Sequence, residues 1–172
     1  MRISDEDLYI RRVNDDLRVS APRLHFLSGN PLIRLHDGDA VPFDIQVTLF
    51  NGSQEATFRR AVDRFVVSYD LWNENFKVAR LHGGQRSGLS ASEAERWCLD
   101  NLPVSAAGIP PGDRLWVRLE IRAPDPPDAS AGAGGDPGIS LKSLVDLFGR
   151  PARSSPHWTL NSASFRLEDL DR

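Results

Sequence analysis

Four histidines and one cysteine are the side chains of this sequence that most often bind metal ions or take part in catalysis. No two histidines lie two to five residues apart, which is the spacing of paired zinc ligands, and the cysteine has no second thiol to join it. Asp37-Gly38-Asp39 lacks the later acidic positions of an EF-hand loop, so it predicts a turn. The sequence therefore predicts no metal site and no cofactor. The histidines are His25, His36, His82 and His157, and the cysteine is Cys98.

Covalent catalysis needs an activated nucleophile, and no motif of the sequence supplies one. Cys98 falls on the apolar stripe of a predicted helix, well past the helix N-terminus that could activate a thiol. No Gly-x-Ser-x-Gly motif is present, and the glycine-rich stretch His82–Gly88 lacks the Gly-Lys-Ser/Thr ending of a phosphate-binding loop. We therefore expect that stretch to be a flexible connection, and we expect no catalytic residue. A hydrolase with a site built from scattered residues remains an alternative.

Two tryptophans are candidate binding residues because they interrupt otherwise polar faces of predicted strands. Tryptophan beside arginine is a combination enriched at protein–protein hot spots, so this face predicts a docking surface for another protein. In a second interpretation, the predicted helices pack on these tryptophans and complete a second layer. The candidate docking residues are Trp72, Trp116, Arg118 and Arg122.

Alternation of apolar and polar residues is the strongest structural signal, and it is typical of half-buried antiparallel strands. Asn73–Asn75 is a short loop at which two of these strands would form a hairpin. The clear strands are Val41–Phe50, Phe65–Trp72, Phe76–Leu81 and Leu115–Arg122, and weaker ones are Leu8–Val13, Leu17–Phe26 and His157–Leu167.

The last weak strand changes phase along its length. Trp158 and Leu160 lie at even positions, whereas Phe165 and Leu167 lie at odd ones. One extra residue restores the alternation, so we expect a β-bulge near Asn161–Ser162.

Two helices are predicted by their capping residues and apolar stripes. Ser90 and Glu93 form a capping box for a helix that Pro103 ends. A second helix is expected over Ser140–Phe148, before Gly149. A third, short helical turn is expected from Asn30-Pro31 to Gly38.

The segment Ala123–Gly138 differs from its surroundings, because it holds four prolines and four glycines. It predicts a linker between a main body of residues 1–122 and a helix–strand tail of residues 139–172 that is too small to fold alone and docks back. We therefore expect a single β-rich domain spanning residues 1–172. Its fold class would be mainly β, an antiparallel β-sandwich or open barrel with about seven strands and two short inserted α-helices.

Charge and composition exclude several classes of protein. The 21 basic residues against 24 acidic ones give a net charge of −3, which argues against nucleic acid as a partner. No run of 18 apolar residues is present, and the acidic start Met1–Asp7 is unlike a secretory signal. The sequence as given fits the cytoplasm, and a trimmed N-terminus would fit the periplasm or envelope.

Several short stretches in order resemble a bacterial family known only as a domain of unknown function (four-three-nine-zero). They begin at Phe26-Leu27-Ser28 and continue with Pro31–Leu35, Gly38 and Val41–Phe43; later ones are Tyr69–Trp72, Ser90–Leu102, Arg114–Arg122 and Trp158–Ser162. The resemblance implies an envelope-associated bacterial protein with no assigned catalysis, and it supplies no functional residues.

These observations favour a non-catalytic protein-interaction module, such as an accessory or structural subunit of a bacterial assembly. An alternative is a carrier of an apolar ligand or lipid inside the β-structure. Such a carrier would have a cavity lined by Phe43, Val47, Phe65 and Leu119.

Overall fold

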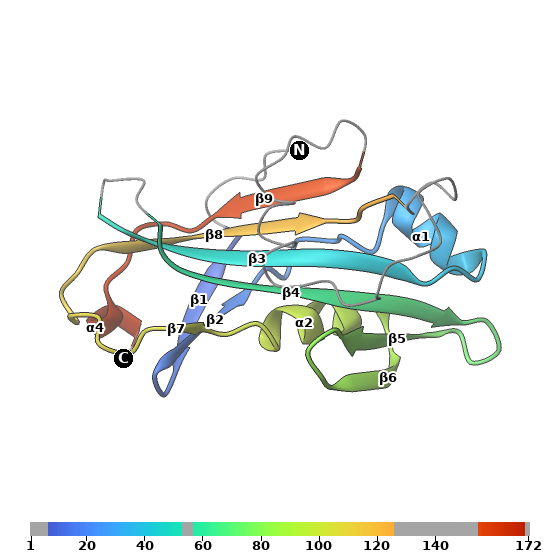
Figure 1. The fold of residues 1–172 in the computed structure, drawn as a ribbon, viewed down its shortest axis with the longest axis horizontal. Coiled ribbons are helices and arrows are strands. Elements are labelled where there is room, and N and C mark those ends of the chain that lie inside the picture. The colour runs from blue at the N-terminus through green and yellow to red at the C-terminus, as the bar shows by residue number, and fades with distance from the viewer. Residues whose placement is uncertain (1–6, 53–56, 126–154, 171–172) are drawn as a thin grey trace, which may run out of the picture.

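A computed structural model describes residues 7–52, 57–125 and 155–170 of the chain. Within these residues, two antiparallel sheets, one of six strands and one of three, pack in a sandwich-like arrangement that does not close into a barrel. The mainly β fold predicted from the alternating pattern is confirmed (Figure 1). The described part contains nine strands and three short helices, where the sequence predicted about seven strands and two helices.

The larger sheet has the strand order β6-β5-β4-β3-β8-β9, and β3 is its long central strand. The odd-numbered residues of β3 form the inner face of the sheet, with Phe43 opposite Phe65 and Val47 opposite Leu119. The strands are β3 (Val41–Asn51), β4 (Thr57–Asp70), β5 (Asn75–Arg80), β6 (Gln85–Leu89), β8 (Leu115–Arg122) and β9 (His157–Asn161).

The smaller sheet and two helices cover the inner face of the larger sheet. β1 (Tyr9–Val13), β2 (Asp16–Ser20) and β7 (Val104–Ser105) form the smaller sheet, and β1 and β2 cross the long strands at a steep angle (Figure 1). The helix α2 (Ala91–Asp100) packs against β2, β5 and β6, and α1 (Gly29–His36) packs against β3 and β4. The core therefore lies between these two layers.

Local signals explain where α2 begins and how it is oriented. The Ser90 side chain accepts a hydrogen bond from the Glu93 N–H, and the Glu93 carboxylate accepts one from the Ser90 N–H, which completes the predicted capping box. Ala94 and Cys98 are fully buried on the face that meets the core.

The structure differs from the sequence expectations at several elements. The stretch His82–Gly88 was expected to be a flexible connection, but its second half belongs to β6 (Gln85–Leu89) because the main chain there pairs with β5, which requires no apolar pattern. The two-residue β7 and the short α4 (Leu167–Leu170) were not predicted. The expected helix Ser140–Phe148, and the linker from residue 126 onward, lie outside the described residues.

The predicted bulge near Asn161–Ser162 is present. Arg118 pairs with Asn161 and Leu115 pairs with Phe165, so three steps along β8 face four steps along the other chain segment. The Ser162 hydroxyl accepts a hydrogen bond from the Val117 N–H, so this N–H has an acceptor where the extra residue interrupts the regular pairing. The tail segment that follows β9 is thus held along β8.

Candidate functional site

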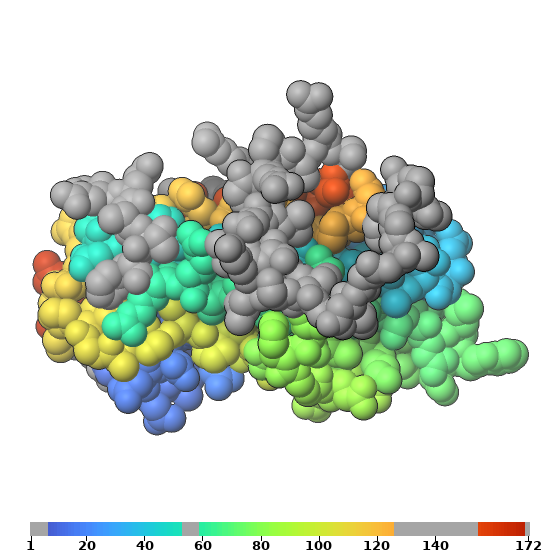
Figure 2. Space-filling view, in the orientation of Figure 1, coloured from blue at the N-terminus to red at the C-terminus, as the bar shows by residue number. Residues whose placement is uncertain are grey.

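Trp72 lies at the tip of the β4–β5 hairpin and is almost fully in solvent. Its exposed fraction is 95%, and that of the neighbouring Leu71 is 58%. In the space-filling view this tip protrudes from the body as the green end of the molecule (Figure 2). Exposed apolar residues are common on protein surfaces, but a tryptophan left almost wholly in water at a projecting tip is not.

The hairpin tip has a defined conformation despite its exposure. The Asp70 carboxylate accepts hydrogen bonds from the Trp72 and Asn73 N–H groups, at 2.9 and 3.1 Å, and from the Asn73 side-chain amide at 2.8 Å. These bonds, that from the Asn73 side chain foremost, lower the pKa of Asp70. Glu74 adopts a positive φ of 51°, which closes the turn. Leu71 and Trp72 are therefore presented by an ordered turn with a carboxylate on either side.

Trp116 and Arg118 lie on the outer face of the six-stranded sheet, where they contact each other. The rings of Phe50 and Trp116 stack with their centroids 4.0 Å apart, and the Arg118 guanidinium lies 5.3 Å from the Trp116 ring centroid. The Arg118 Nε donates to the Asn161 side chain at 3.1 Å. Arg122, farther along β8 and opposite Asp44, is buried.

The four predicted docking residues do not share one surface. Trp116 pairs with Phe50 near the end of β3, whereas Trp72 lies beyond the opposite end of the sheet, past the pairing of Val41 with Val67. The alternative expectation, that the helices cover these tryptophans, does not hold for α1 and α2, because both pack on the inner face. Trp72 is thus separated from the other three candidates.

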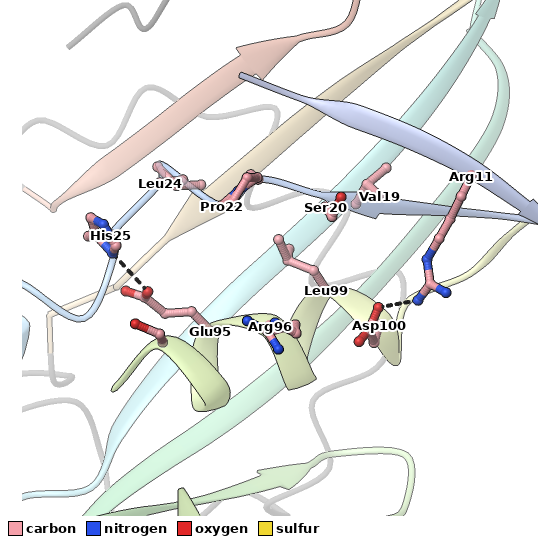
Figure 3. Close-up of a pocket in the computed structure, with 12 residues that line it drawn as sticks. Arg11, Val19, Ser20, Pro22, Leu24, His25, Glu95, Arg96, Leu99 and Asp100 are labelled. Carbon is pink, nitrogen blue, oxygen red and sulfur yellow. Dashed lines mark hydrogen bonds and ion pairs between the residues drawn. The ribbon is translucent and has the colours of Figure 1, made fainter. Parts of the chain in front are cut away.

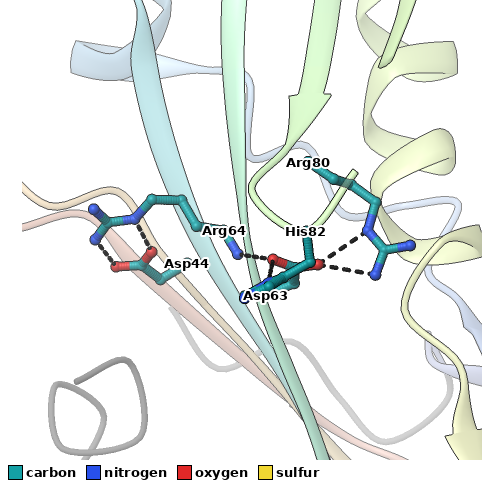
Figure 4. A network of polar contacts seen from close by, with 5 residues as sticks. All are labelled: Asp44, Asp63, Arg64, Arg80 and His82. Carbon is teal, nitrogen blue, oxygen red and sulfur yellow. Dashed lines mark hydrogen bonds and ion pairs between the residues drawn. The ribbon is translucent and has the colours of Figure 1, made fainter. Parts of the chain in front are cut away.

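Two buried aspartates, which the sequence did not single out, organise a network of charged side chains on β3, β4 and β5 (Figure 4). Asp44 receives two hydrogen bonds from Arg64, directly opposite it on β4. Asp63, only 1% exposed, binds Arg80 at 2.9 Å and lies 2.9 Å from Nδ1 of His82. The signal for Asp63 was its place between Ala61 and Phe65 on the inner, apolar face.

The network orients an imidazole, and the described residues place no nucleophile in hydrogen-bond contact with it. The Asp63 carboxylate fixes Nδ1 of His82, an arrangement that in hydrolases orients a general base. Within the described residues no hydroxyl or thiol forms a hydrogen bond with His82, so a nucleophile is missing from this arrangement. Its evident effect is to tie the end of β5 to β4.

A pocket of about 430 Å³ lies between α2 and the layer formed by β1, β2 and the segment after β2 (Figure 3). His25 and Glu95 lie at one end of it, and Arg11 and Asp100 lie at the other. The pocket was not predicted, because its walls come from segments far apart in the sequence.

Glu95 is the buried ionisable group of this pocket. Its carboxylate accepts a hydrogen bond from the Leu27 N–H at 2.8 Å and lies 3.2 Å from Nδ1 of His25. Burial raises the pKa of Glu95, and the two hydrogen bonds offset part of that effect. A signal in the sequence was its position four residues before Leu99, on the same side of the helix.

Cys98 and the residues of the proposed carrier cavity belong to the hydrophobic core. Cys98 is completely buried, and burial raises the pKa of its thiol well above the usual range. Phe43, Val47, Phe65 and Leu119 are at most 1% exposed, and none of them lines the pocket beside α2.

The sequence matches no family model, no curated protein and no solved structure. Within residues 7–52, 57–125 and 155–170, no three side chains of histidine, cysteine, aspartate or glutamate come together as metal ligands. No helix in the same residues has the length and apolarity needed to cross a membrane.

Proposed function

We propose that this chain is a non-catalytic protein-interaction module, such as an accessory subunit of a larger assembly, which docks through Leu71 and Trp72. The observation that carries the proposal is the exposure of Trp72 on an ordered hairpin tip. A tryptophan side chain presents about 200 Å² of surface, so its burial by a partner contributes roughly 5 kcal/mol before the costs of association. Tryptophan is also the residue most enriched at binding hot spots.

The order of the tip lowers the cost of binding. Asp70 fixes the main chain at Trp72 and Asn73 in the unbound protein, so less conformational freedom is lost when a partner covers the tip. The projecting hairpin also lets the indole enter a concave site, which a flat sheet face would not.

The charges beside the tip favour a particular kind of partner. Asp70 and Glu74 lie on either side of the apolar pair in the sequence, and the pKa of Asp70 is lowered from a value that already leaves its carboxylate ionised at neutral pH. The complementary surface is an apolar pocket with arginine or lysine at its rim. An anionic lipid surface would repel these carboxylates, so a protein partner fits the tip better than such a membrane.

The proposal rests on Trp72 rather than on the other predicted docking residues. The Trp116 ring is already stacked on Phe50, and the Arg118 guanidinium is engaged by these rings and by Asn161. Side chains that are occupied within their own chain offer less binding energy to a partner. In this proposal Trp116, Arg118 and Arg122 stabilise the outer face of the sheet.

The test first identifies the partner by crosslinking. The affinity of the purified partner is then measured for the wild-type chain, Trp72→Ala and Ile33→Ala. Trp72→Ala is expected to raise the Kd about thirtyfold or more, as expected for a hot-spot residue. Ile33→Ala is the matched control, because Ile33 is an apolar residue that is 61% exposed on α1, outside the β4–β5 hairpin. Equal affinities of the two variants would refute the proposal.

A lipid control distinguishes a membrane from a protein partner. Vesicles of zwitterionic and of anionic lipid are added to the protein, and its tryptophan emission is recorded. The proposal predicts no change with either composition. A blue shift that Trp72→Ala abolishes would assign the tip to a membrane interface and contradict the proposal.

A further inference from the structure

The pocket beside α2 has an apolar floor formed by residues of the core. Val19, Leu24 and Leu99 each line it, and each has an exposed fraction below 5%. Pro22 lies on the wall opposite the helix (Figure 3), and Ala21 also lines the pocket. Apolar walls and a volume of about 430 Å³ place this pocket within the size range of sites for small organic ligands.

The two acidic side chains of the pocket are already matched by donors. Asp100 accepts a hydrogen bond from Arg11 at 2.6 Å, and the Asp100 carbonyl accepts one from Arg18 at 2.9 Å. Glu95 is held by the Leu27 N–H and lies beside His25. Each of these carboxylates therefore already has at least one partner within the chain.

The pocket has two arginines, and Arg96, unlike Arg11, is not paired with an acidic side chain of the pocket. Arg96 lines the pocket on α2, between Glu95 and Asp100 in the sequence, is exposed to solvent, and forms no hydrogen bond or ion pair with any described residue. Arg96 and Arg86 both help to lower the pKa of Glu93, but the Glu93 carboxylate already accepts the Ser90 N–H and lies outside the pocket. A guanidinium binds a carboxylate through two parallel hydrogen bonds, which is the strongest pairing open to Arg96.

We infer that this pocket binds an amphipathic organic anion, a carboxylate carried on an apolar body. The carboxylate pairs with Arg96, and the apolar body packs against Val19, Leu24 and Leu99. A ligand of roughly a dozen non-hydrogen atoms suits a pocket at this end of the size range. The site is distinct from the hairpin tip and does not depend on the proposed docking function.

The test uses three probes with the same ten-carbon chain: decanoate, decanol and decyltrimethylammonium. Each is titrated into the whole chain while backbone amide signals are followed by NMR. Decanoate is expected to shift the amides of the pocket residues saturably, with a Kd about tenfold or more below that of decanol. The ammonium compound is expected to bind more weakly still. Equal affinity for the three probes, or no saturable shift at the pocket with decanoate, would overturn the inference.

Two arginine variants show whether decanoate binding depends on Arg96 itself or only on the overall charge of the protein. Arg96→Gln is expected to weaken decanoate binding about tenfold or more and to leave decanol binding unchanged. Arg86→Gln is the matched control, because Arg86 also acts on Glu93 but lies on β6, outside the pocket. Unaltered decanoate binding in Arg96→Gln, or an equal loss in both variants, would contradict the role given to Arg96.

Discussion

Replacing Asp63 with asparagine is expected to destabilise the fold by about 3 kcal/mol. Asp63 is almost fully buried and serves Arg80, His82 and the Arg64 N–H together. Breaking a buried ion pair from one side costs about 3–5 kcal/mol, because it leaves an uncompensated charge. Since the Arg80 side chain is 26% exposed, water solvates part of the orphaned guanidinium, which favours the lower end of that range.

Urea unfolding followed by circular dichroism measures this difference directly. Asp39→Asn is the matched control, because the Asp39 carboxylate is 62% exposed where it pairs with Arg34 at 3.8 Å, and its loss is expected to cost no more than about 1 kcal/mol. The midpoint should move while the slope of the unfolding free energy against urea stays constant. In a double-mutant cycle, Asp63→Asn and Arg80→Gln should be non-additive. A loss in Asp63→Asn no larger than that in Asp39→Asn would refute the structural role of this network.

Three further changes have defined outcomes. Ser90→Ala removes the cap of α2 and is expected to lower the unfolding free energy by about 1 kcal/mol, measured in urea; an unchanged midpoint would contradict the cap. Ser162→Ala leaves the buried Val117 N–H without its acceptor and is expected to cost about 1–3 kcal/mol in the same assay, whereas a neutral result would argue against the bulge geometry. Glu95→Gln removes a carboxyl group whose pKa is raised by folding. The free energy of unfolding of the wild type relative to this variant is therefore expected to be highest below pH 4.5 and to fall as the pH rises through the folded-state pKa of Glu95. A difference that grows with pH would contradict the raised pKa.

The strands of the larger sheet were predictable because one of their faces is apolar. The alternation at Val41–Phe50 and Leu115–Arg122 gave β3 and β8 with nearly their observed bounds. The same rule failed at β6, where four of five residues are exposed and main-chain pairing with β5 defines the strand. Alternation reports burial, so a strand at the sheet edge that buries little gives no such signal.

The alternation of apolar and polar residues also did not predict that the polar face of β3 is buried. Asp44, Gln46 and Thr48 occupy the polar positions of β3, yet all three are buried. Gln46 donates to Glu120, and Asp44 binds Arg64, so polar partners on neighbouring strands make this burial possible. A sequence pattern cannot reveal such partners, because they depend on the register between strands.

The candidate sites were predictable to different degrees. Trp72 was predicted from its residue type, and the hairpin at Asn73–Asn75 was also expected. The separation of Trp72 from Trp116 was not predictable, because it follows from the register of the sheet. The pocket beside α2 gave no local signal, because Arg11, His25 and Arg96 come to line one pocket only after both layers have packed. Single residues that protrude are thus easier to predict than surfaces assembled from distant segments.

Photo-crosslinking from the hairpin tip tests the proposed docking function most directly. A photoreactive amino acid replaces Trp72 in one form of the chain and Ile33 in another, and both are expressed in the native cells and irradiated. The docking function predicts one discrete protein adduct from position 72 that position 33 does not give and that excess wild-type chain suppresses. Identical, diffuse or absent protein adducts at the two positions would contradict it.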